Sequence, residues 1–399
     1  MFKNNLIILI VSLVHISVFS QSEIILESET VDINEQPLAF TSISIMSKSI
    51  GTISNEEGRF YLRLTKENLN DTITISTLGF KSFKIMVQDF INQEIEVVTL
   101  EEDLVSLDEI VIKDPSSYVK SALKKLKETT YSKGHQLNIL YRRFSNENNV
   151  SRFLVEHYVK VYDNGPTSRE FGPIEIVEAR KSNDYRFAKK KQKFHAIKMI
   201  AKQNPLRIRI NSKNYKWKIV DDTSYDGEDV IVLEGTDKNK KSKWIKLYIG
   251  SDTSNIYRLE KSDLNAVYIY KKDKDGTMVL SYHNREYVFW EKVSPQTKRL
   301  LKLKEDKIKL SYRHEAIVLG IETERKKIRV SENIKPGKDI GDYNLKYDSE
   351  FWKSVSLPPD SKFYKESSKQ LENIYGISIE TQFKRVKIKY NYPYKETYS

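Results

Sequence analysis

Short alternations of apolar and polar residues fill the first hundred positions of the chain and predict β-strands. In the segment 40–46, Ile43 and Ile45 fall on one side of an extended chain and serines on the other. The stretch 51–60 predicts a hairpin of a strand, a tight turn and a second strand paired with the first, because Asn55 to Gly58 is turn chemistry between strand-forming residues. Further strands are predicted at 24–33, 71–76, 81–87 and 95–100. About seven short strands at this spacing predict two packed sheets, a β-sandwich.

The rest of the chain mixes helical and strand patterns. Apolar residues recur at helical spacing over 116–129, after Asp114 as N-cap and Pro115 at the first helical position. A second helix is predicted at 361–375, capped by Asp360 and closed by Gly376. Strands are predicted at 137–144, 153–162, 174–179, 230–234, 243–249, 256–262, 266–270, 278–282, 286–290, 308–312 and, at the end, 381–390. The predicted fold is therefore mainly β: an N-terminal sandwich, then an α+β domain built on a curved antiparallel sheet with a few helices.

Charge divides the chain at the same place. Residues 21–113 hold 7 Lys and Arg against 17 Asp and Glu, a net charge of −10. Residues 114–399 hold 59 against 38, a net charge of +21. This asymmetry predicts a domain boundary near Asp114, with a sandwich at 21–113 and a basic β-rich domain at 114–399. The basic part should be attracted to anionic surfaces.

Three motifs in the acidic part resemble the carboxypeptidase-like regulatory domain family. They are Val31-Asp32 followed by Pro37-Leu38, the stretch 51–60 with Gly51, Gly58 and Phe60, and the stretch 71–81 with Asp71 and Gly79. The segment 104–112 resembles the exit that usually follows this domain. The resemblance covers about residues 24–113 and implies a prealbumin-like β-sandwich, common in exported proteins of double-membraned bacteria.

The resemblance implies no activity, because in carboxypeptidases and TonB-dependent receptors alike the domain is an accessory module. This chain has neither an attached zinc-peptidase domain nor room for a large receptor barrel. Tyr141-Arg142-Arg143 and the segment 156–162 are similar to an uncharacterised region that follows this sandwich in many related exported proteins.

The first twenty residues are interpreted as a cleaved signal peptide. Lys3 precedes an apolar run at 6–19, and Val18 and Ser20 place small residues before the predicted cleavage at Gln21. A transmembrane anchor is the alternative, but the run is shorter than the roughly 20 residues that span a bilayer. The chain has no Cys, which removes disulfides, thiol nucleophiles and a lipid-modified cysteine. We therefore expect an extracytoplasmic protein, in the periplasm or at the outer-membrane periphery, with no membrane span after cleavage.

No catalytic, metal or cofactor motif is present, so we predict no catalytic residue, no metal ligand and no cofactor. The six His lack metal-ligand spacing, and the chain has no Gly-x-Ser-x-Gly elbow or phosphate-binding Gly-rich loop. Asp273 to Gly276 is interpreted as a hairpin turn rather than a calcium loop, because the remaining ligands are missing. Two carboxylates from distant strands could still form a glycosidase pair.

The stretch 179–218 is the most basic segment, with 14 Lys and Arg against the single Asp184. Aromatic residues interleave with the charges, a pattern that favours polyanion binding. Export argues against nucleic acid and favours an anionic lipid or glycan; a solvated surface is the alternative. The predicted anion-binding residues are Arg180, Lys181, Arg186, Lys189, Lys190, Lys191, Lys193, Arg207 and Arg209.

Three functional hypotheses follow. The first is an exported, non-enzymatic accessory or binding protein of the cell envelope that binds an anionic lipid or glycan or an outer-membrane protein partner. The second is a hydrolase of envelope glycans or peptides whose active site is assembled from distant residues. The third is a structural spacer. The sequence favours the first, because of its export segment, accessory sandwich and divided charge.

Overall fold

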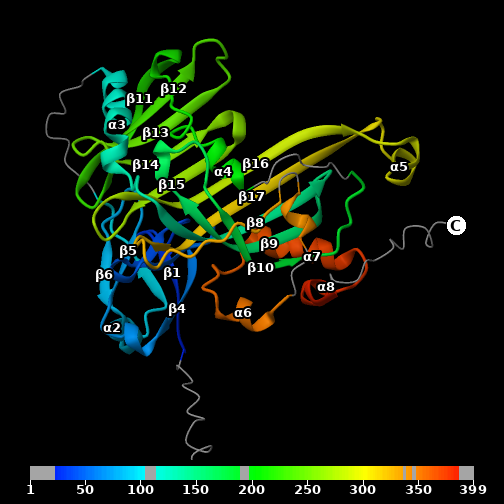
Figure 1. Cartoon of the computed structure of the whole chain (residues 1–399), viewed down its shortest axis with the longest axis horizontal. Coiled ribbons are helices and arrows are strands. Elements are labelled where there is room, and N and C mark those ends of the chain that lie inside the picture. Colours follow the sequence, from blue (N-terminus) through cyan, green and yellow to red (C-terminus); the bar gives the residue numbers. More distant parts are fainter. Residues whose placement is uncertain (1–22, 104–113, 189–196, 336–337, 344–346, 386–399) are drawn as a thin grey trace, which may run out of the picture.

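The computed structural model describes residues 23–103, 114–188, 197–335, 338–343 and 347–385 (Figure 1). The helices there are α2 (Val87–Asn92), α3 (Pro115–Thr129), α4 (Lys198–Lys202), α5 (Pro295–Leu300), α6 (Ser349–Ser354), α7 (Lys362–Asn373) and α8 (Ile379–Arg385). The strands are β1 (Glu23–Val31), β2 (Ser42–Ile45), β3 (Ile50–Ile53), β4 (Arg59–Thr65), β5 (Thr72–Ser76), β6 (Phe83–Met86), β7 (Val97–Thr99), β8 (His135–Glu147), β9 (Val150–Asp163), β10 (Ile174–Lys181), β11 (Tyr215–Tyr225), β12 (Glu228–Asp237), β13 (Trp244–Gly250), β14 (Ile256–Lys261), β15 (Ala266–Lys272), β16 (Met278–Lys292) and β17 (Lys307–Glu322).

The N-terminal strands form the predicted sandwich. One sheet has the order β4-β1-β7, and β3-β2-β5-β6 form the other side. Its core joins apolar side chains of both sheets, including Phe60 and Leu62 from β4 and Ile43 and Ile75 from β2 and β5. The alternation of apolar and polar residues therefore places one face of each sheet in a shared core, as the sequence predicts.

The motif residues of the sandwich lie at turns, polar contacts and close backbone approaches. Gly58 has a φ of +76° in the turn before β4, and Gly79 has a φ of +86°. Asp71 accepts from Asn68 and forms an ion pair of 2.7 Å with Lys48. Pro37 forms an isolated bridge with Val31, and a Cβ on Gly51 would lie 2.8 Å from the carbonyl oxygen of Ile43.

The predicted pairing of the two strands around the turn 54–58 is wrong. Both strands exist, but β3 pairs with β2 and β17, whereas β4 pairs with β1 and lies in the opposite sheet. The turn therefore carries the chain from one sheet of the sandwich to the other. It does so because Ile53 and Phe60 pack into different cores, one outside the sandwich and one within it.

The larger sheet is antiparallel and curled, with the order β11-β12-β13-β14-β15-β16-β17-β8-β9-β10 (Figure 1). The sandwich joins it directly, because Gly320 on β17 pairs with Ile50 on β3. The joint lies where β16 no longer accompanies β17, since their pairing ends at Tyr282 and Ile317. The two parts of the described chain thus share one continuous set of hydrogen-bonded strands.

Different elements cover the two faces of this sheet. The first, which we call the α3/α4 face, packs against Val119 and Ala122 of α3 and Ile200 of α4. The second, the α7 face, packs against Tyr364 and Leu371 of α7. The sandwich and α6 complete the second covering, where Ile53 and Trp352 meet the sheet.

Both predicted helices exist, but only α3 begins with the predicted cap. Asp114 accepts from the backbone N–H of Ser116 at 3.1 Å and caps α3 as predicted. The cap of α7 is Ser361 instead of Asp360, because the Ser361 hydroxyl accepts from the N–H of Tyr364. The predicted closing strand 381–390 is wrong over residues 381–385, since Ile379–Arg385 is helical; residues 386–390 lie outside the described residues.

The observed strands differ from the predicted ones more in length than in position. Residues 278–282 and 286–290 belong to one strand, β16, and β17 is far longer than the predicted 308–312. β11 was not predicted, because its run of charged residues hides the alternation. The turn at 273–276 is a hairpin turn as predicted: Asp273 accepts from the N–H groups of Asp275 and Thr277. The signal peptide 1–20 and the exit segment 104–112 lie outside the described residues.

Candidate anion-binding site

Two arginines and a histidine form a row across three neighbouring strands on the α3/α4 face. Arg285 on β16 lies directly opposite His314 on β17, which lies directly opposite Arg143 on β8. Directly opposite residues have Cβ atoms about 4.5–5.5 Å apart. All three side chains are buried, with exposed fractions of 3% for Arg285, 3% for His314 and 1% for Arg143. The row therefore concentrates positive charge inside the protein.

The two guanidinium groups are balanced differently. Arg143 donates to both carboxylate oxygens of Asp339, at 2.8 and 2.6 Å. Arg285 instead donates to the amide oxygen of Gln203 and to the hydroxyl of Tyr287, and its guanidinium lies 4.4 Å from the Tyr287 ring centre. Neither partner is charged, and no carboxylate of the described residues forms an ion pair with Arg285. Burying a guanidinium without a counter-charge is costly, so this position calls for an anion.

The histidines of this region stay neutral. Burial, reinforced by Arg285, lowers the pKa of His283 to about 3. Burial, with Arg285 and Arg143, also holds the pKa of His314 well below its usual range. Nδ1 of His283 lies 2.9 Å from the carbonyl oxygen of Val267, so this nitrogen carries the proton and donates it. The histidines therefore add hydrogen-bonding groups to the site but no charge.

Tyr141 and His314 are not tuned for acid–base catalysis. The Tyr141 hydroxyl is hydrogen-bonded to Nδ1 of His314. Burial raises the pKa of Tyr141, whereas that of His314 is lowered, so the proton stays on the tyrosine oxygen. A phenolate nucleophile is not favoured here, and Asp339 is already paired with Arg143. This arrangement suits the binding of an anion better than the transfer of a proton.

Gln203, which accepts from Arg285, is itself partly exposed. It follows the last residue of α4 and is half-buried, as is Tyr287, whose hydroxyl donates to the same amide oxygen at 2.7 Å. The next residue, Asn204, donates to the hydroxyl of Tyr270 at 2.7 Å. The amide oxygen of Gln203 thus occupies the place where an oxygen of an anionic ligand would meet Arg285.

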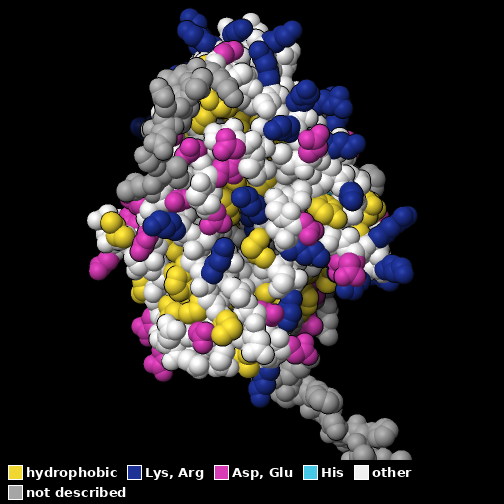
Figure 2. Space-filling model, turned by 90° about the vertical axis from the view of Figure 1, so that its left-hand side faces the viewer, with side chains coloured by type: hydrophobic (Ala, Val, Ile, Leu, Met, Phe, Trp, Pro, Cys, Tyr) yellow, Lys and Arg dark blue, Asp and Glu magenta, His cyan; other side chains and the backbone are white. Residues whose placement is uncertain are grey.

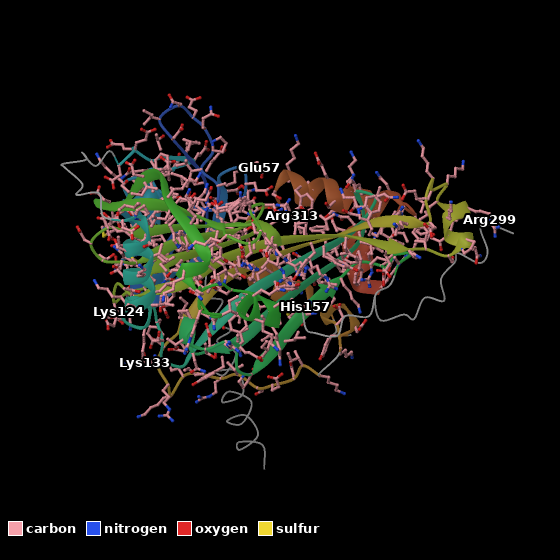
Figure 3. The ribbon with its side chains drawn as sticks, turned by 90° about the horizontal axis from the view of Figure 1, so that it is seen from above. Glu57, Lys124, Lys133, His157, Arg299 and Arg313 are labelled. Carbon is pink, nitrogen blue, oxygen red and sulfur yellow. The ribbon has the colours of Figure 1, made fainter. Side chains whose placement is uncertain are left out.

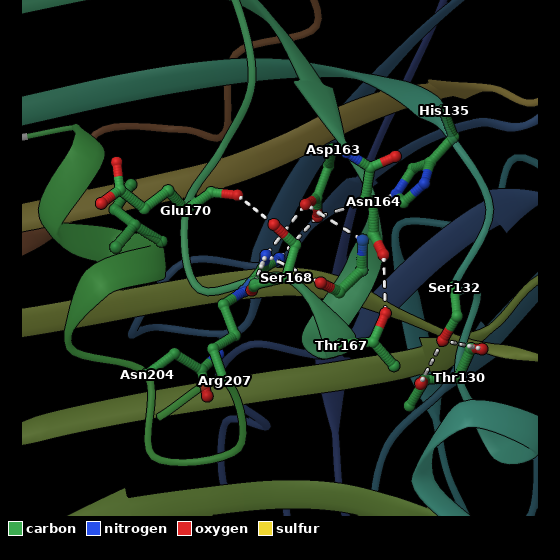
Figure 4. A network of polar contacts seen from close by, with 12 residues as sticks. Thr130, Ser132, His135, Asp163, Asn164, Thr167, Ser168, Glu170, Asn204 and Arg207 are labelled. Atoms are coloured by element: carbon green, nitrogen blue, oxygen red, sulfur yellow. Dashed lines mark hydrogen bonds and ion pairs between the residues drawn. The ribbon is translucent and has the colours of Figure 1, made fainter. Parts of the chain in front are cut away.

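The turn after α4 is fixed by a buried ion pair (Figure 4). Arg207 donates to both oxygens of Asp163, at 2.9 and 2.6 Å, and to the carbonyl oxygens of Gly165 and Ser168. Although burial opposes the charge, Arg207 holds the pKa of Asp163 below its usual value. This anchoring holds Gln203 in place from the C-terminal side.

The structure does not bring the sequence-predicted anion-binding residues together. Arg180 lies on the α7 face, 2.5 Å from Glu156, which also accepts from Arg142. Lys181 lies on the opposite face and donates to the carbonyl oxygen of Gly341 at 2.7 Å. Arg186 pairs with Asp184, Arg207 with Asp163, and Arg209 is exposed; Lys189, Lys190, Lys191 and Lys193 lie outside the described residues. Anion binding by these residues stays a prediction.

Sequence reasoning missed the row of Arg285, His314 and Arg143. A signal was present: His283, Arg285 and Tyr287 alternate at strand spacing, so that polar residues occupy the positions that should face a core. The same holds for Tyr312 and His314.

A recess between the sandwich and β11–β12 has the opposite charge. It encloses about 380 Å³ and is lined by Glu102, Asp103, Asp222 and Asp229, among others. Burial and neighbouring carboxylates raise the pKa of Asp229.

Figure 2 shows Lys and Arg side chains gathered above, over the larger sheet, with fewer over the sandwich below. No group of three or more metal-ligating side chains occurs among the described residues.

Comparison with known families identifies the sandwich. Residues 29–112 match the model of the CarboxypepD_reg-like domain, which confirms the resemblance to the carboxypeptidase-like regulatory domain. No curated protein matches the chain. In the parts of the chain that the structure describes, no helix is long and apolar enough to cross a membrane.

Solved structures resemble the chain only weakly. A putative outer membrane lipoprotein-sorting protein domain from Vibrio parahaemolyticus is 11% identical, with 55% of this chain and 94% of that chain covered, at a TM-score of 0.24. A LolA superfamily protein from Nitrosomonas europaea is 14% identical, with 50% and 92% covered, at 0.21. The MucA/MucB complex from Pseudomonas aeruginosa is 9% identical, with 53% and 99% covered, at 0.19. We base no function on TM-scores of this size.

Proposed function

We propose that the protein is an exported, non-enzymatic binding protein of the cell envelope, and that Arg285 on its α3/α4 face binds an anionic group of an envelope lipid or glycan. The observation that carries the proposal is a guanidinium that is 3% exposed and paired with no carboxylate of the described chain. The predicted signal peptide and the accessory character of the sandwich support a role in the envelope.

Binding would proceed by exchange of one oxygen for another. A phosphate or carboxylate oxygen replaces the amide oxygen of Gln203 at Arg285, and the Tyr287 hydroxyl donates to the same oxygen. A charged acceptor forms shorter and stronger hydrogen bonds to a guanidinium than an amide oxygen does. The histidines beside Arg285 are neutral, and no carboxylate of the described residues pairs with it. The ligand would therefore be the counter-charge of Arg285.

Calorimetric titration tests this proposal with short-chain phosphatidylglycerol below its micellar concentration and with glucosamine 6-phosphate, which represent the lipid and glycan sources. Short-chain phosphatidylcholine and glucosamine are the corresponding probes without net negative charge. We expect binding of one anionic probe, loss of that binding in Arg285→Met, and tighter binding in Gln203→Ala, where no amide oxygen competes. Arg258→Met is the matched control, because Arg258 lies on β14 and pairs with Glu260.

Arg285→Met should fold, since replacing a buried unpaired charge by an apolar side chain of similar length is neutral or stabilising. A thermal melt of each variant establishes this. Absence of binding by the wild-type protein, or equal binding by wild type and Arg285→Met, would overturn the proposal.

A further inference from the structure

Strands β16 and β17 extend beyond the rest of the sheet as a two-stranded arm. β15 accompanies β16 only as far as Arg285, and β8 accompanies β17 only from Leu310 onward. Beyond these limits, Trp290 pairs with Lys309 and Lys292 with Lys307. Helix α5 closes the tip, and Arg299 marks its outer end in Figure 3, away from the body (Figures 1 and 3).

One face of this arm combines exposed apolar side chains with lysines. Val288, Trp290 and Lys292 alternate along β16 and share a face with Lys309 and Lys307 of β17. Trp290 is 62% exposed and Val288 is 53% exposed. We call these five residues the arm face.

The lysines of the arm face lie close enough together to repel one another. Lys292 lies directly opposite Lys307, and like charges directly opposite one another destabilise a β-ladder. Among the described residues, none of the three lysines forms an ion pair with a carboxylate; Lys309 donates to the amide oxygen of Asn149 at 3.2 Å. No carboxylate in the described part of the chain offsets this charge, so an external anion would stabilise the lysines.

The tip of the arm also combines basic side chains with partly exposed apolar ones. Residues 287–310 hold seven Lys and Arg against three Asp and Glu. Leu300, Leu301 and Leu303 are only half-buried there, beside Lys298, Arg299, Lys302 and Lys304. Exposed tryptophan flanked by lysines is the composition of side chains that lie at a membrane–water interface, where the indole sits at headgroup level and lysines extend to phosphates.

We propose that the arm face docks the protein on an anionic lipid surface, with Trp290 at the level of the headgroups and Lys292, Lys307 and Lys309 on lipid phosphates. Charge complementarity selects this occupant over an apolar protein groove, because three lysines surround the single indole. The five side chains also share one face of β16 and β17, so that they can meet a plane together. The inference uses residues distinct from Arg285 and does not depend on the function proposed above.

Vesicle co-sedimentation of the chain from Gln21 onward, without the apolar segment 6–19, tests the inference. The vesicles are phosphatidylcholine alone, or phosphatidylcholine with one quarter phosphatidylglycerol, at low and high salt. We expect binding only to the anionic vesicles and at low salt, and a roughly hundredfold loss of affinity in the triple variant with Gln at 292, 307 and 309. The matched control replaces Lys120, Lys124 and Lys127, exposed on α3, by Gln; it removes equal charge and should bind nearly as wild type.

Tryptophan fluorescence provides a second readout that surface charge alone would not change. On anionic vesicles the emission should shift to the blue, and the shift should disappear in Trp290→Ala. Equal vesicle affinity of the two triple variants, or an unchanged emission of wild type, would overturn the inference. So would a dimer in analytical ultracentrifugation that dissociates in Trp290→Ala, because the arm face would then bind a second copy.

Discussion

Arg143 and Asp339 lie 196 positions apart and form a two-pronged ion pair, with N–O distances of 2.8 and 2.6 Å. Burial opposes the charge of the carboxylate, but the guanidinium holds the pKa of Asp339 well below its usual range. The pair attaches the segment 338–343 to the α3/α4 face. Asp339 is the counter-charge of Arg143, whereas Arg285 has none among the described residues.

Asp339→Asn should therefore destabilise the protein by about 3–5 kcal/mol, because it leaves Arg143 buried without a counter-charge. Urea denaturation measures this loss. The matched control is Glu350→Gln, which breaks an exposed pair with Lys353 and should leave the stability unchanged. Equal stability of the two variants would contradict the assignment.

His283 should make the protein less stable in mild acid. Its pKa is lowered to about 3 in the folded state, against about 6.5 in an unfolded chain. Between these values the unfolded state binds the proton that the folded state refuses, so the free energy of unfolding falls as the pH falls. The slope from this one residue is at most about 1.4 kcal/mol per pH unit.

Denaturation of wild type and His283→Gln over a series of pH values isolates this contribution. The difference between the two proteins should shrink from neutral pH toward pH 4, because only the wild type loses the stability that depends on a neutral His283. A constant difference over that range would show that His283 does not titrate as described.

Lys271 should reduce stability at neutral pH. It faces a recess lined by Met46, Ile50 and Ile321, and burial lowers its pKa to about 8. Since the folded pKa lies below the unfolded value of about 10.4, stability should rise as the pH increases between these values.

Lys271→Met should raise the free energy of unfolding at pH 7 by about 1–3 kcal/mol and abolish that rise. Lys272→Met is the control, because Lys272 lies 5.4 Å from the ring centre of Tyr225 and should gain nothing from the change. A gain of equal size in both variants would indicate a general effect of added apolar surface instead.

Two glycines with the same backbone conformation allow the cost of backbone strain to be distinguished from the cost of a steric collision. Gly58 has a φ of +76° and Gly276 a φ of +78°. A Cβ on Gly58 would lie 2.4 Å from the carbonyl oxygen of Thr30, whereas a Cβ on Gly276 meets nothing within 4 Å. The carbonyl oxygen of Gly58 also accepts from the N–H of Thr30 at 2.8 Å, so the two segments cannot move apart freely.

Gly276→Ala should cost about 1–2 kcal/mol from the left-handed conformation alone. Gly58→Ala should cost about 3 kcal/mol or more, because the collision adds to the same strain. Thermal melts of the two variants measure the difference, and equal melting temperatures would contradict the collision.

The sandwich was predictable because its signals are local. Alternation places Ile43 and Ile75 in the core, and Gly58 marks a turn that only a positive φ permits. The start of α3 was predictable for the same reason, since Asp114 and Pro115 are adjacent. Over 381–385 the predicted closing strand is a helix, and there the amide of Gln382 donates to the carbonyl oxygens of Leu371 and Ile377, contacts outside this helix that the local pattern does not show.

The candidate site was not predictable because it is assembled from distant positions. Arg143 and Arg285 flank His314 only through the register of β8, β16 and β17. Their polar side chains interrupt the apolar alternation of strands that are nevertheless buried. Because of this interruption, β16 was predicted as two separate strands. The domain boundary at residue 113 stays a prediction, because the described strands continue from the sandwich into the larger sheet.

The pairing of Gly320 with Ile50 has a consequence for the order in which the chain becomes complete. β3 lies between β2 and β17, so until β17 is present the sandwich has an unpaired edge at β3. Synthesis proceeds from the N-terminus, and this edge therefore stays open while some 270 further residues are added. Open edges recruit other strands. A sandwich that is cut free after residue 113 would consequently expose β3 as an edge open to strand pairing, and in the full chain β17 covers this edge.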